Sequence, residues 1–203
     1  MAAVSLEQGA YLVSLARSAI EQYFASGKRM APGRKDAPLS EKRGVFVTLE
    51  SYPSHELRGC IGYPLPVSPL GNAVVDSALH AAFEDPRFPP LEKAELGMTV
   101  MEVSVLTVPE EMEVKSPDEY LKKIKVGRDG LIISYGYSSG LLLPQVPIEW
   151  NWNEEEFLAH LCEKAGLPRN LWKSPSAKIS RFEAQIFSEE RPGGKAVQKR
   201  LIR

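Results

Sequence analysis

Cys60 and its neighbours are the most unusual chemical feature of the sequence. The thiol lies in the run Leu57–Gly62 (LRGCIG), where two glycines flank Cys60 and Ile61 and remove side chains that would shield it. Arg58 comes two residues earlier in a predicted strand, so we expect it on the same face as Cys60. Because a nearby cation favours the thiolate, the pattern predicts a reactive or substrate-contacting cysteine. The alternative is a small buried apolar residue, since free cysteines are often buried.

His80 is the candidate general base. It lies in a predicted helix with Asp76 and Glu84 four residues away on either side, an arrangement that could orient an imidazole. One hypothesis is therefore a nucleophile and base pair formed by Cys60 and His80. The alternative is a solvated helix face on which carboxylates surround a partly exposed histidine. At the level of sequence both interpretations stay open.

Five further residues are candidates for contact with a substrate. Arg87 lies in the proline-bounded loop Asp85–Pro90, which could hold its guanidinium in place as an anion clamp. Glu102 shares one face of a predicted strand with Ser104 and could line a pocket. An Asp–Arg surface turn and a half-exposed strand explain these two features equally well. The candidate substrate-binding residues are Arg58, Gly59, Gly62, Arg87 and Glu102.

The sequence predicts neither a metal site nor another cofactor. Its two cysteines and three histidines are scattered without the paired spacing of a metal site. It has no glycine-rich nucleotide-binding motif. Cys162 lies on the apolar stripe of a predicted helix beside Leu161, which indicates a core residue.

Charge and composition narrow the classes of partner. Acidic and basic residues number 26 and 25, and the formal net charge is −1. This balance provides no field that would attract DNA or RNA, so nucleic-acid binding is not expected. The sequence has no signal-peptide pattern and no run of eighteen apolar residues, so we expect no membrane contact. Together with the sparse cysteines, these features predict a cytoplasmic location.

Hydrophobic periodicity predicts an α+β fold. The helices are expected at residues 5–26, 68–84, 116–124 and 153–165, with Ser5, Ser68 and Asn153 as N-caps. The strands are expected at residues 44–50, 57–62, 98–106, 131–135, 140–143 and 181–187. The polar segment from Glu189 is interpreted as a mobile tail. Without a strict strand–helix–strand rhythm, the order favours a mainly antiparallel sheet with packed helices over a parallel doubly wound sheet.

The LRGCIG run resembles the signature of the AMMECR family, named after the Alport syndrome, midface hypoplasia and elliptocytosis chromosomal region. Four other stretches resemble positions of the same family, which extends the resemblance over about residues 6–187 of a single 203-residue domain. This sequence resembles the prokaryotic members of the family, and among them the archaeal ones. The four stretches are Asp85–Pro90, Glu102–Leu106, Gly130–Ile133 and Leu142–Val146.

The resemblance implies a fold of two interleaved subdomains, with the signature beside a cleft between them. It implies no established reaction, because the family is described as uncharacterised, with suggested roles in transcription, replication, repair or translation. Prokaryotic relatives are associated with Memo-type proteins and radical S-adenosylmethionine enzymes, which are the protein partners that the resemblance suggests.

The sequence therefore supports two hypotheses about function. The first is a cytosolic enzyme, or a component of one, in which Cys60 and His80 act on an unknown small molecule or peptide. The second is a non-catalytic regulatory module whose LRGCIG region recognises a protein, peptide or metabolite.

Overall fold

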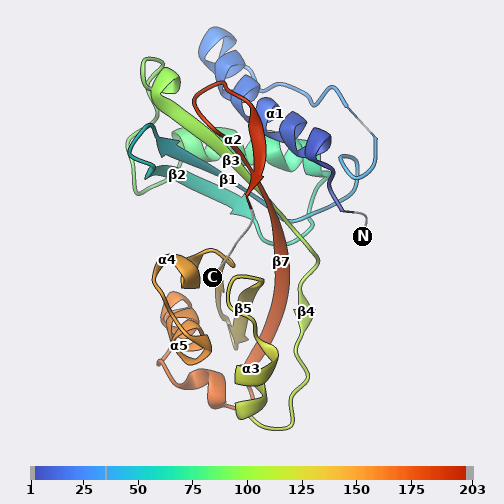
Figure 1. The fold of residues 1–203 in the computed structure, drawn as a ribbon, viewed down its shortest axis with the longest axis vertical. Coiled ribbons are helices and arrows are strands. Elements are labelled where there is room, and N and C mark those ends of the chain that lie inside the picture. The colour runs from blue at the N-terminus through green and yellow to red at the C-terminus, as the bar shows by residue number, and fades with distance from the viewer. Residues whose placement is uncertain (1–2, 35, 200–203) are drawn as a thin grey trace. The chain divides into compact units, whose positions relative to one another are not determined.

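The computed structural model describes residues 3–34 and 36–199 (Figure 1). These residues form five α-helices and eight β-strands, which confirms the α+β class, and the strand pairings that define the sheet are antiparallel. The chain divides into two compact units. The first comprises the chain up to Leu106 together with Gln185–Lys199, and the second comprises Thr107–Ala184. Within the described residues, none of the helices combines the length and apolar character that crossing a membrane requires.

The first unit is a sheet with two long helices on one face. Its strands follow the order β2-β1-β3-β7, with β8 paired to β7, so that β2 is an edge strand. The elements are α1 (Leu6–Ser26), β1 (Val45–Ser51), β2 (Glu56–Tyr63), α2 (Leu70–Phe83), the 3-10 turn η1 (Glu95–Met98), β3 (Thr99–Leu106), the end of β7 (Lys178–Glu189) and β8 (Ala196–Lys199).

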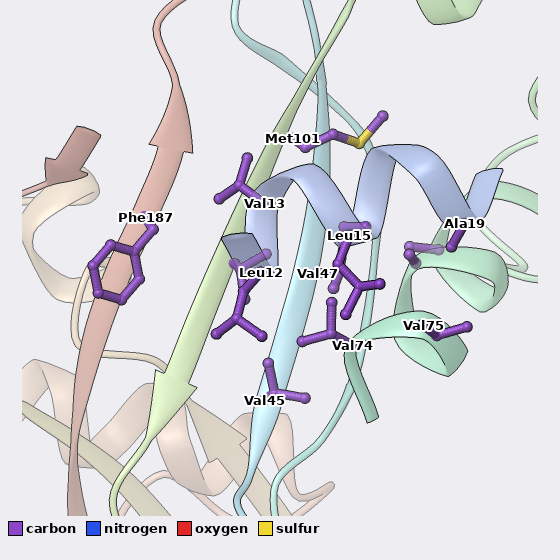
Figure 2. Close-up of a cluster of buried hydrophobic side chains, with 14 of the residues drawn as sticks. Leu12, Val13, Leu15, Ala19, Val45, Val47, Val74, Val75, Met101 and Phe187 are labelled. Atoms are coloured by element: carbon purple, nitrogen blue, oxygen red, sulfur yellow. The ribbon is translucent and has the colours of Figure 1, made fainter. Parts of the chain in front are cut away.

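The core of the first unit lies between this sheet and α1 and α2. Val45 and Val47 of β1 point from the sheet toward Leu12 and Leu15 of α1, and Val74 of α2 fills the space beside them (Figure 2). All five side chains are almost completely buried. Because side chains alternate along a strand, one face of the sheet packs against α1 and α2, and the opposite face carries the residues of β1 that lie between the valines.

Local capping explains where α1 begins and ends. The Ser5 hydroxyl accepts a hydrogen bond from the Gln8 N–H, and the Gln8 side chain accepts one from the Ser5 N–H, which is the predicted capping box. Gly27 ends the helix with a left-handed φ of 66°. The cap predicted at Ser68 is wrong, because the N-cap position of α2 is Pro69 and no side chain caps this end.

The second unit has its own sheet, in which β5 lies between β7 and β6 and β4 pairs with the opposite edge of β7. Its core includes Phe157 and Cys162 of α5, which pack with Ile133 and Trp172; the complete burial of Cys162 confirms it as a core residue. The elements are β4 (Glu110–Glu111), α3 (Asp118–Lys123), β5 (Asp129–Tyr135), β6 (Ser138–Leu142), α4 (Val146–Glu149), α5 (Glu154–Lys164), η2 (Leu171–Lys173) and the first part of β7.

The tail predicted to be mobile from Glu189 is ordered up to Lys199. Strand β8 pairs with the end of β7, from Glu189 opposite Ala196 to Ile186 opposite Lys199. The Glu189 carboxylate is buried because Arg17 of α1 donates two hydrogen bonds to it, of 2.6 and 2.5 Å. A charged residue that the sequence suggests is solvated thus holds the C-terminal hairpin against α1. The rest of the predicted tail lies outside the described residues.

Candidate functional site

Cys60 lies in the middle of the edge strand β2, in a row of side chains that crosses three strands. It is paired with Thr48 of β1, and Thr48 is paired with Glu102 of β3. The Thr48 hydroxyl donates a hydrogen bond of 3.3 Å to the Cys60 sulfur. Thr48 and Glu102 are buried and Cys60 is partly buried. The pairing therefore brings Glu102, a predicted substrate contact, onto the same face as Cys60.

The two glycines of the signature are explained by close packing. A Cβ atom added to Gly59 would collide with the carbonyl oxygen of Ala81 in α2. A Cβ atom added to Gly62 would collide with the main chain of β1 at Val45 and Phe46. The glycines thus permit helix α2 and strand β1 to approach β2, whereas the sequence suggested that they expose the thiol.

Gly59 also fixes the direction of the Cys60 side chain. Because Gly59 faces α2 and successive residues of a strand point to opposite faces, Cys60 points to the face of the sheet away from α2. His80 belongs to α2. Its Nε2 lies 3.9 Å from a Glu84 carboxylate oxygen, and its ring lies edge-on to that of Tyr63 at 6.4 Å. Among the described residues, the structure does not bring His80 and Cys60 together as a hydrogen-bonded pair.

Asp85 and Arg87 hold the main chain of Cys60 from outside the sheet. The Cys60 N–H donates a 2.9 Å hydrogen bond to Asp85 Oδ2, and Arg87 Nη2 donates one of 3.0 Å to the Cys60 carbonyl. Arg87 also donates to both Asp85 oxygens, from Nε at 2.9 Å and from Nη2 at 2.6 Å. This pair, named here the Asp85–Arg87 clamp, occupies main-chain groups to which another strand could otherwise bind.

Electrostatics make the clamp tight. The hydrogen bonds from Arg87 lower the pKa of the Asp85 carboxyl to about 2, and the N–H groups of Cys60 and Arg87 act in the same direction. Only 2% of the Asp85 side chain is exposed, whereas half of the Arg87 side chain is. Arg87 is predicted from the sequence as an anion clamp, and the anion that it binds here is the neighbouring Asp85 carboxylate, with the Cys60 carbonyl as a second partner.

Arg58 is held by the loop that follows α2. Its Nε and Nη2 donate to Glu95 at 2.9 and 3.0 Å, and Nη1 donates to the Pro89 carbonyl at 3.0 Å. The register between β1 and β2 shifts here, because Leu49 pairs with Gly59 but the next residue pairs with Leu57. Arg58 is the extra residue of this bulge, which breaks the alternation that would place it beside Cys60.

The surroundings of the Cys60 thiol disfavour its ionised form. Burial raises its pKa, while the hydrogen bond from Thr48 and the charge of Arg87 oppose that rise. The carboxylates of Glu102 and Asp85 add to the rise by disfavouring a second negative charge. The cation that acts on the thiol is thus Arg87, and the expectation of a thiolate stabilised by Arg58 is not met.

Sequence reasoning missed Thr48, Asp85 and Lys199. Lys199 of β8 donates a 2.5 Å hydrogen bond to the Glu102 carboxylate, so the presumed pocket residue is held by the C-terminal hairpin. The hairpin register could have indicated Thr48, whereas no local signal points to Lys199. Within residues 3–34 and 36–199, no three His, Cys, Asp or Glu side chains gather as ligands for a metal ion.

Comparison with known proteins agrees with the signature. The profile of the AMMECR1 family matches residues 13–187. The chain is 52% identical over 202 residues to Protein MJ0810 of Methanocaldococcus jannaschii, covering 100% of both, and 54% identical over 207 residues to Protein PYRAB00100 of Pyrococcus abyssi, again covering 100% of both. The crystal structure of the uncharacterised protein PH0010 from Pyrococcus horikoshii is similar, with a TM-score of 0.92 at 53% identity, covering 98% of this chain and 99% of that one. With most of its length matched and archaeal relatives above half identity, this chain belongs to the AMMECR1 family.

Proposed function

We propose that this protein is a non-catalytic recognition module that binds an acidic peptide segment of a partner protein. The binding surface is named here the clamp surface and consists of Arg58, Cys60, Arg87 and Phe88. The Asp85–Arg87 clamp carries the proposal, because its hydrogen bonds hold the main chain of Cys60 rigid and do not involve the sulfur atom. A rigid, preorganised surface is what recognition requires, since less conformational entropy is lost on binding.

The chemistry of the clamp surface selects an anion. The Phe88 ring lies near two guanidinium groups. The Cζ atom of Arg58 lies 6.0 Å from the ring centroid, and the Cζ atom of Arg87 lies 5.5 Å from it. Arg87 is half exposed, and its Nη1 donates no hydrogen bond to any residue that the structure describes. A carboxylate could therefore bind Nη1 while an apolar neighbour in the same peptide packs on Phe88.

An enzyme with Cys60 as the nucleophile is the rival function. The observation in its favour is that Cys60 is only partly buried, so that a substrate could reach the sulfur. Against it stand the raised pKa of the thiol and the position of His80 on the helix that covers the opposite face. The proposal also includes a cytoplasmic location, because both cysteines are free thiols, which is typical of a reducing compartment.

Thiol labelling against pH separates the two functions. In a Cys162→Ala protein only Cys60 reacts, and we expect slow labelling at neutral pH that accelerates above the usual thiol range. Rapid labelling with an apparent pKa below about 8.5 would instead favour the enzyme. The Cys60→Ala protein reports the background.

Selection from a random peptide library tests recognition directly. We expect the wild-type protein and Cys60→Ser to enrich peptides rich in Asp and Glu, and Arg87→Gln to lose that enrichment. Arg128→Gln is the matched control, because Arg128 is also partly exposed and pairs with a buried aspartate, Asp129, but lies in the second unit. Thermal unfolding of each variant shows that it is folded. Equal enrichment of acidic peptides by Arg87→Gln would contradict the proposal.

A further inference from the structure

The second unit carries three aromatic rings that stack toward its surface. Trp152 lies over His160 with ring centroids 3.9 Å apart and planes 11° from parallel. Trp150 continues the series, with its ring centroid 6.2 Å from that of Trp152 and planes 19° from parallel. Trp150 is 68% exposed. This set of rings, named here the Trp150 stack, therefore presents an indole to solvent.

Two capping motifs fix the backbone that carries the indoles. The Trp152 N–H donates to the Pro147 carbonyl at 2.8 Å, and the Asn151 N–H donates to the Ile148 carbonyl at 3.1 Å. With Asn151 at a left-handed φ of 52°, these bonds form the Schellman motif that ends α4. Asn153 then begins α5 with a capping box. The two indoles thus lie on either side of a fixed turn.

The inner end of the stack is anchored. Trp152 packs against the hydrophobic core of the second unit. His160 Nδ1 lies 2.7 Å from a Glu163 carboxylate oxygen, and Arg169 donates a 2.7 Å hydrogen bond to the other oxygen of Glu163. A ligand that stacks on Trp150 would therefore meet a surface that is already ordered, which lowers the entropy lost on binding.

The charges around the stack select the sign of a ligand. The segment Glu149–Glu156 contains four carboxylates and no Lys or Arg. Within it, Glu155 pairs with Lys173 at 3.2 Å and Glu156 accepts from the N–H of Asn153. Indole faces carry negative quadrupole potential, which favours a cation, and a segment without Lys or Arg offers no charge that would attract a phosphate.

We propose that the Trp150 stack binds the guanidinium group of an arginine in a partner peptide. A guanidinium is planar and weakly hydrated, so it stacks on an indole more readily than a lysine ammonium does. This site lies in the second unit, so the proposal is independent of the clamp surface and of the function proposed for it.

The three tryptophans provide the test, because each indole N–H gives its own nuclear magnetic resonance signal. The full-length protein is titrated with a short glycine peptide that contains two arginines. We expect the Trp150 and Trp152 signals to move and saturate. The Trp172 signal should stay fixed, because Trp172 is buried in the core of the second unit.

Variants and matched ligands decide the outcome. Trp150→Ala should lower the affinity for the arginine peptide at least fivefold, whereas Trp150→Phe should retain most of it. Because the Trp150 side chain is exposed, both variants should fold. Three results would overturn the proposal. They are equal shifts with a peptide carrying glutamine in place of arginine, larger shifts with adenosine monophosphate, and no shift at about 10 mM peptide, a concentration that detects even millimolar dissociation constants.

Discussion

The Asp85 carboxylate and the Arg87 guanidinium together bind both main-chain polar groups of Cys60. The signature on β2 and the loop after α2 are therefore one structural unit, although 25 residues separate Cys60 from Asp85. Two of the motifs by which the family resemblance was identified thus meet at a single residue, Cys60. This arrangement gives a physical reason why both motifs occur in one chain.

The clamp should contribute strongly to stability. In Asp85→Asn the carboxylate can no longer accept charge-assisted hydrogen bonds from Arg87, and the free energy of unfolding should fall by about 2–3 kcal/mol. Urea unfolding measures the loss. Glu111→Gln is the control, since Glu111 pairs with Lys178 at an exposed site and should change stability by less than about 1 kcal/mol. Equal losses in both variants would argue against a stabilising clamp.

The same carboxylate should shape the acid limb of stability. Its pKa is about 2 in the folded protein, against a usual value of 3.8, so the folded state favours the ionised form. This contribution is fully present above pH 3.8 and is lost as the pH falls toward 2. Since the side chain is buried, the shift corresponds to about 2 kcal/mol. Unfolding measured between these pH values should show a shallower decline in Asp85→Asn than in the wild type.

Gly59 should not accept even one methyl group. In Gly59→Ala the new Cβ would collide with the Ala81 carbonyl, and moving α2 away should cost about 2–3 kcal/mol. Thermal unfolding with calorimetry reports this loss. Gly97→Ala is the matched control, because nothing lies within 4 Å of its added Cβ. If the two alanine variants unfold at the same temperature, close packing does not explain the first glycine of the signature.

The buried ion pair between Arg17 and Glu189 should matter more than an exposed one. Arg17→Ala leaves a buried carboxylate that still accepts from the Met101 N–H, and we expect a loss of about 3–5 kcal/mol. Arg29→Ala breaks the more exposed pair with Asp76 and should cost less than about 1 kcal/mol. Denaturant unfolding distinguishes them, and a small effect of Arg17→Ala would refute the anchoring of the C-terminal hairpin.

Asn151 should tolerate glycine better than alanine. Its φ of 52° is left-handed, so Asn151→Ala should destabilise the second unit by about 1 kcal/mol, whereas Asn151→Gly should be neutral or slightly stabilising. Hydrogen exchange of the amides in α4 and α5 reports the effect locally. Identical exchange in the two variants would show that the turn does not depend on this conformation.

Local signals predicted the elements well. The caps at Ser5 and Asn153 use partners three residues away, so the sequence contains both halves of each motif. Likewise, the hairpin of β1 and β2 follows from two adjacent apolar runs. Ser68 fails as a cap because composition indicates a helix start but does not fix which residue occupies the N-cap.

The site was harder to predict because it depends on contacts between distant residues. The position of Arg58 depends on a bulge, which arises from the register of two strands and has no signature in one of them. The contact of Asp85 with Cys60 depends on the length of α2. Glu189 appeared solvated because its partner Arg17 is 172 residues away in the chain. Each of these failures therefore concerns a contact whose partner cannot be identified from the sequence alone.

Strand β7 has a consequence for how the protein is made. The first unit lacks residues 185–199 until the segment 107–184 of the second unit has been synthesised. The segment 107–184 of the second unit is therefore fully synthesised while the first unit still lacks part of its sheet. At that stage α1, α2, β1, β2 and β3 have been made, but the end of β7 and strand β8 have not. A chain truncated after residue 184 would therefore contain the segment 107–184 of the second unit, attached to a first unit without its last two strands.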